Sequence, residues 1–89
     1  MSFGYLYAME QTNSLYFEHK GTKYSATVKE DITTEPKILV ICPNETDEPA
    51  KEIKFELHGS EWVGPQSLQN EFPETYQSLL KAIKVAGYL

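Results

Sequence analysis

Four stretches of the chain alternate apolar and polar side chains with a period of two, which is the pattern of a half-buried β-strand. These stretches are residues 3–9, 15–19, 23–29 and 51–58. The last is the most regular, because Ile53, Phe55 and Leu57 alternate with charged side chains. Lys20-Gly21 separates the second stretch from the third, and glycine takes the positive φ that tight hairpin turns require. We therefore expect the first three stretches to form an antiparallel meander.

Two further segments complete the predicted sheet. Residues 37–42 contain the uninterrupted apolar run Ile38 to Ile41, which is typical of a central strand buried on both faces. Residues 61–63 follow a Gly59-Ser60 turn, and we interpret them as a short returning strand at the edge of the sheet.

The period changes to three and four residues near the C-terminus, which indicates an amphipathic helix. Pro73 suits the first turn of this helix, Asn70 is a candidate cap just before it, and Gly87 fits its end. Strands followed by a helix predict an α+β fold: an antiparallel β-sheet of about five strands with one C-terminal α-helix packed on one face. The apolar positions of the helix are Phe72, Tyr76, Leu79, Leu80 and Ile83.

Length and composition favour one globular domain spanning residues 1–89. The chain is 40% hydrophobic and 24% charged, and its six Tyr, four Phe and one Trp supply large side chains for a core. Cys42 is the one cysteine, so an intramolecular disulfide is excluded. The N-terminal MSFGYLYAME lacks the basic and apolar regions of a signal peptide. We therefore expect a cytoplasmic protein without membrane association, in which the Asn44-Glu45-Thr46 sequon carries no sugar.

The charge distribution bears on the choice of partner. The net charge is −5, arginine is absent, and residues 45–71 hold seven acidic residues against two lysines. Direct nucleic-acid binding needs clustered cations to displace counterions from phosphates, and this chain does not supply them. An acidic middle segment instead favours another protein as partner, one that is basic or binds nucleic acid itself.

Side chains that could support catalysis or bind a metal are few. Cys42 ends an apolar strand and is followed by carboxylates, so we interpret it as a packing residue. His19 and His58 stand at strand ends beside turns, where we expect them to be solvated. The loop with Asn44, Glu45, Asp47 and Glu48 lacks the glycine and the spacing of a calcium loop. We expect no catalytic residue, no cofactor and no metal site, although a dyad of Cys42 with either histidine stays open as an alternative.

Aromatic residues offer a candidate binding surface. A single helix covers only one face of the sheet, so some of Tyr5, Tyr7, Tyr16 and Tyr24 should stay exposed, and exposed aromatic patches mark interaction sites. Trp62 is either a further anchor for a partner or a cap on the open edge of the core.

No motif in the chain carries a resemblance to a known family, so function is predicted from these features together. We expect a small acidic, non-enzymatic protein-binding module, such as an inhibitor, an immunity protein or an anti-defence protein of a phage or mobile element. One alternative is a homo-oligomeric structural or assembly protein, with a homodimer as its simplest form; another is a small Cys/His enzyme. The predicted partner-binding residues are Tyr5, Tyr7, Glu45, Asp47, Glu48, Glu61 and Trp62.

Overall fold

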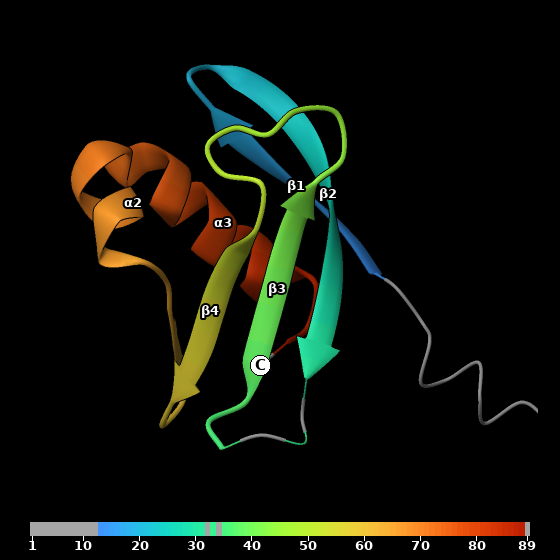
Figure 1. Cartoon of the computed structure of the whole chain (residues 1–89), viewed down its shortest axis with the longest axis vertical. Coiled ribbons are helices and arrows are strands. Elements are labelled where there is room, and N and C mark those ends of the chain that lie inside the picture. Colours follow the sequence, from blue (N-terminus) through green and yellow to red (C-terminus); the bar gives the residue numbers. More distant parts are fainter. Residues whose placement is uncertain (1–12, 32, 34, 89) are drawn as a thin grey trace, which may run out of the picture.

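A computed structural model describes residues 13–31, 33 and 35–88 of the chain. Five antiparallel strands form one curled sheet in sequence order, followed by two helices (Figure 1). The predicted strand over residues 3–9, with Tyr5 and Tyr7, lies outside the described residues. The elements are β1 (Asn13–His19), β2 (Thr22–Asp31), β3 (Ile38–Pro43), β4 (Ile53–His58), β5 (Glu61–Val63), α2 (Gln66–Glu71) and α3 (Pro73–Val85).

The turn between β1 and β2 forms where the sequence predicts it. Lys20 and Gly21 have φ of 55° and 80°, and His19 pairs directly with Thr22. Positive φ at both central residues is the geometry of a two-residue turn whose twist matches that of the strands it joins. The predicted α+β class, with five antiparallel strands and a C-terminal helix, is therefore confirmed for the described residues.

The start of α3 differs from the prediction. Asn70 belongs to α2, which was not predicted, and the residue that precedes α3 is Phe72, whose non-helical backbone separates the two helices. Pro73 occupies the first turn of α3, where its missing N–H is not needed. At the other end Gly87 has φ of 88° and its N–H donates to the Lys84 carbonyl, while the Tyr88 N–H donates to the Ile83 carbonyl. This pair of bonds is the Schellman ending that glycine favours.

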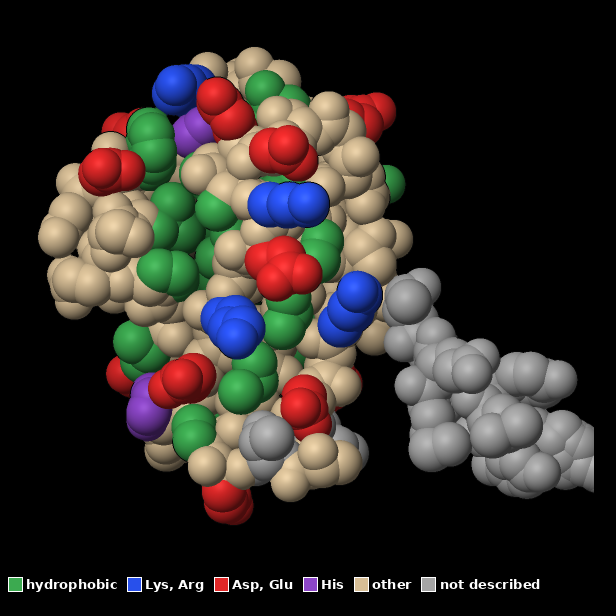
Figure 2. Space-filling view, in the orientation of Figure 1, with side chains coloured by type: hydrophobic (Ala, Val, Ile, Leu, Met, Phe, Trp, Pro, Cys, Tyr) green, Lys and Arg blue, Asp and Glu red, His purple; other side chains and the backbone are tan. Residues whose placement is uncertain are grey.

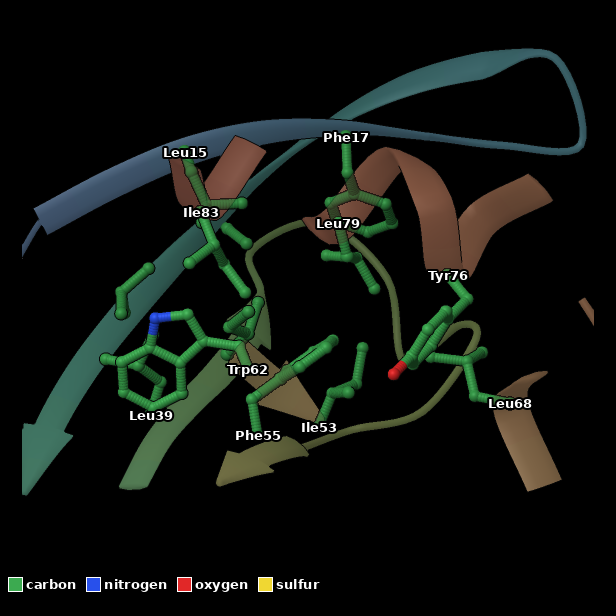
Figure 3. Packing of buried hydrophobic residues seen from close by; sticks show 13 residues of the cluster. Leu15, Phe17, Leu39, Ile53, Phe55, Trp62, Leu68, Tyr76, Leu79 and Ile83 are labelled. Atoms are coloured by element: carbon green, nitrogen blue, oxygen red, sulfur yellow. The ribbon is translucent and has the colours of Figure 1, made fainter. Parts of the chain in front are cut away.

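The hydrophobic core is one cluster formed by the inner side chains of the strands together with buried residues of α2 and α3. In Figure 3, Leu79 and Ile83 project from α3 towards the strands, and both are fully buried. Every strand contributes to the same cluster, because alternate side chains of a strand point to the same face. The buried strand residues are Leu15, Phe17, Ala26, Val28, Leu39, Ile41, Ile53, Phe55 and Trp62.

Both edges of the sheet are restricted as sites of strand pairing. Helix α3 contacts β1, and the Glu18 N–H at the edge of β1 donates to Ser78 Oγ at 2.8 Å. The opposite edge, β5, is three residues long. A helix beside one edge and a very short strand at the other are two ways in which proteins avoid edge-to-edge association.

Gly64 provides a test of this packing. A Cβ at this position would lie 2.7 Å from Phe55 Cε2 and 2.9 Å from Tyr76 Cε1, and the Gly64 N–H donates to the Tyr76 hydroxyl at 3.0 Å. Gly64→Ala should therefore lower the free energy of unfolding by about 1–3 kcal/mol, as overpacked cores do. Urea denaturation measures the change, with the exposed Ser60→Ala as control. Equal stability of the two variants would contradict the described packing of Phe55 and Tyr76.

Candidate protein-interaction surface

The outer face of the sheet contacts solvent and has a mixed character. At its centre Val40 of β3 is half-buried between Lys29 and Lys54, which lie in register with it on the neighbouring strands. Ile38 and Cys42, the next outward residues of β3, are half-buried as well. Figure 2 shows this face, where hydrophobic, basic and acidic side chains are interspersed. It is therefore accessible to a partner without being a continuous apolar patch.

The loop between β3 and β4 is held against the sheet by Asn44. Its backbone N–H donates to the Ser25 carbonyl at 3.0 Å, and its side-chain amide donates to Ser25 Oγ at 3.0 Å. The Thr27 hydroxyl donates to Asn44 Oδ1 at 2.7 Å. Glu45 and Asp47 follow and are exposed. Three hydrogen bonds to β2 thus determine where these carboxylates stand.

Glu48 of the same loop lies close to the β1–β2 turn. Glu48 Oε1 lies 3.6 Å from His19 Nε2 and 3.9 Å from Lys20 Nζ. His19 Nδ1 forms a 2.8 Å hydrogen bond with Thr75 Oγ1, and the His19 ring meets the Phe72 ring edge-on at 4.8 Å. Because Thr75 and Phe72 lie beside His19, its side chain is only 2% exposed. The prediction that His19 is solvated is wrong, since it faces the inner side of β1, next to the start of α3.

The predicted partner-binding residues that the structure describes lie in separate places. Glu45, Asp47 and Glu48 lie in the loop at one end of the sheet, whereas Glu61 follows the turn at the other end of β4. Glu61 is exposed. Trp62 is 7% exposed, and its indole N–H donates to the Tyr88 carbonyl at 3.0 Å. This position corresponds to the alternative in which Trp62 closes the edge of the core.

A second acidic area appears at the Glu61 end of the sheet. Asp31 and Glu56 flank Ile38 on the outer face, because β2 and β4 both pair with β3 there. His58, which is exposed as predicted, lies 3.1 Å from the Glu56 carboxylate. The distribution of charge along the sequence does not predict this area, because Asp31 and Glu56 are distant in sequence. They become neighbours because both pair with Ile38 across adjacent strands.

The residues proposed for a Cys/His dyad are apart. Cys42 points to the outer face, whereas His19 points to the inner one. His58 lies beyond Glu56, at the opposite end of β3 from Cys42. Among the described residues there is no group of three or more His, Cys, Asp or Glu side chains arranged to hold a metal ion. None of the helices in residues 13–88 that the structure describes is long and apolar enough to cross a membrane.

No protein-family model, curated protein or solved structure matches this chain. Function is therefore inferred from the chemistry and geometry of the described residues.

The attachment of the loop is open to a direct test. Asn44→Ala removes two side-chain hydrogen bonds and should lower the free energy of unfolding by about 0.5–2 kcal/mol. The amides of residues 45–48 should exchange faster with deuterium, because the loop keeps only its backbone hydrogen bond to Ser25 and loses the side-chain bonds to Ser25 and Thr27. Asn70→Ala is the control, since the Asn70 side chain bonds only to exposed Gln66 in α2. Unchanged exchange in the loop of Asn44→Ala would contradict this account.

The hydrogen bonds of the Asp31 carboxylate make its contribution to stability depend on pH. The hydroxyl of Thr33 at 2.7 Å, and then its backbone N–H at 3.0 Å, hold the pKa of Asp31 below its ordinary value. A carboxylate with a lowered folded-state pKa contributes stability above about pH 4, and this contribution is lost as the pH falls through the folded-state pKa. Thr33→Val should raise the pKa of Asp31, as measured by NMR titration of its carboxyl carbon. A pKa that does not move would mean that the hydroxyl has no effect.

Proposed function

We propose that the protein is a small, non-enzymatic protein-binding module whose acidic loop engages a basic or nucleic-acid-binding partner protein. The observation that carries the proposal is the attachment of this loop to β2 through the three hydrogen bonds of Asn44, with Glu48 close to His19 and Lys20. A loop that is already held in place loses little conformational freedom on binding, and less of the interaction energy is spent on ordering it.

The charge of the loop supports this choice of partner. Residues 44–52 contain Glu45, Asp47, Glu48 and Glu52 against Lys51, and all five side chains are exposed. Exposed carboxylates close together attract a basic surface, raise the association rate and repel acidic competitors. By occupying a cationic surface that normally contacts phosphates, the module would block it. That is the mode of action of an inhibitor, an immunity protein or an anti-defence protein.

In the proposed arrangement the inner face of the sheet forms the core and the outer face binds the partner. Helix α3 covers the inner face, in keeping with the burial of Tyr76, Leu79 and Ile83, and leaves the outer face and the loop to the partner. An assembly through sheet edges finds less support, because the Glu18 N–H is bonded to Ser78 and β5 is short. A cytoplasmic location and the absence of catalysis stay predictions.

The proposal predicts a charge-dependent complex. Tagged protein from the native host should retain a partner identifiable by mass spectrometry, and binding of the purified partner should weaken as salt is raised. Asp47→Lys should weaken this binding about three- to tenfold, which corresponds to roughly 0.7–1.4 kcal/mol. Glu71→Lys, at an exposed site in α2, changes the net charge equally and is the matched control.

Two results would overturn the proposal. One is the absence of any retained protein when expression is at native level. The other is a partner whose affinity is insensitive to salt and falls equally in Asp47→Lys and Glu71→Lys, because the acidic loop would then have no particular part in the contact.

A further inference from the structure

Tyr16 is the aromatic side chain that the outer face leaves in water. It is 60% exposed, whereas the other described tyrosines, Tyr24, Tyr76 and Tyr88, are buried or half-buried. Tyrosine combines a large rigid ring with a polar tip and is enriched where proteins contact one another. What an exposed tyrosine on a strand can bind therefore depends on the side chains around it.

The acidic loop brings a carboxylate to the same place. Tyr16 pairs with Ser25 across β1 and β2, and Ser25 holds Asn44 through two hydrogen bonds. Glu45 is the next residue after Asn44. The result is a hollow of about 340 Å³ on the outer face, lined by Tyr16, Lys23, Ser25 and Glu45. The aromatic ring and the carboxylate are thus positioned by the same contacts that attach the loop.

The chemistry of this hollow suits a cation. The face of an aromatic ring attracts a positive charge, and Lys23 Nζ already lies 5.6 Å from the centre of the Tyr16 ring. Glu45 supplies an exposed negative charge on the same hollow. A guanidinium group fits best, because it stacks on a ring with its plane and donates two hydrogen bonds to a carboxylate from its edge.

We propose that Tyr16 and Glu45 form a docking site for one arginine or lysine side chain of the partner protein, with arginine preferred. This inference rests on the proposed function, since it names the side chain that the acidic surface receives. The incoming cation takes the place of Lys23 over the Tyr16 ring and pairs with Glu45. Because Lys23 is exposed, it moves into water at little cost.

The position of Lys23 over the Tyr16 ring distinguishes this site from a nonspecific attraction between charges. Lys23 competes with the incoming cation for the ring, so its removal should tighten binding. Lys23→Met should do so by more than Lys29→Met, which removes the same charge from the same face of β2. A merely nonspecific attraction between an acidic protein and a cation would respond equally to both substitutions.

The probe is the peptide acetyl-Gly-Arg-Gly-amide, titrated into the ¹⁵N-labelled full chain and followed by NMR. The control peptide carries citrulline, which has the shape of arginine without its charge. Arginine should bind about fivefold or more tightly than citrulline, and it should shift the Tyr16 ring and the Glu45 amide. Tyr16→Leu and Glu45→Gln should each weaken binding about two- to fivefold, and Lys23→Met should strengthen it about twofold or more.

Glu71→Gln controls for the loss of one negative charge and should leave the affinity for the arginine peptide unchanged. Equal binding of the two peptides would overturn the proposal, as would equal effects of Lys23→Met and Lys29→Met. A chain that self-associates through Tyr16, seen as a concentration-dependent dimer lost in Tyr16→Leu, would identify a second copy as the occupant and also overturn it. If the arginine site fails while partner binding keeps its dependence on Asp47, the proposed function stands without it.

Discussion

Burial of the inner side chains of the strands in one cluster with Tyr76, Leu79 and Ile83 of α3 is the constraint on which the rest of the described structure depends. Leu79 and Ile83 reach full burial only because all five strands direct alternate apolar side chains to the same side. Strand alternation then obliges the remaining side chains to face water, so the outer face carries Tyr16, Lys23 and their neighbours. Among the described residues, α3 does not cover this second face, so its side chains are accessible to a partner.

The position of the acidic loop, residues 44–52, depends on contacts with β1, β2 and the start of α3. Phe72 and Thr75 lie beside His19 and bury it, Glu48 lies 3.6 Å from the His19 ring, and Asn44 holds the start of the loop on β2. The loop is therefore part of a built surface that includes Tyr16. The proposed binding role rests on these contacts, while Cys42 is remote from both histidines and the Glu18 N–H at the edge of β1 donates to Ser78 of α3.

Local patterns predict most of the secondary structure. The Lys20-Gly21 turn and the strand over residues 61–63 form where the chain's period-two alternation and its glycines indicate. The start of α3 was missed by two residues, because Asn70 is a good cap by type but lies inside α2. Helix α2 itself has six residues and buries only Leu68, so its sequence carries little amphipathic signal. Its formation depends on packing against α3.

The sequence by itself determined the α+β class, the Lys20-Gly21 hairpin, the acidity of residues 45–71 and the absence of arginine. These properties follow from side-chain periodicity and composition, which are local. Tertiary structure decided that His19 is buried, that Trp62 belongs to the core and that Glu61 is remote from the acidic loop. It also decided that Tyr16 and Glu45 share one hollow. Such neighbours are set by strand register and by hydrogen bonds between residues far apart in the chain, and no local pattern encodes them.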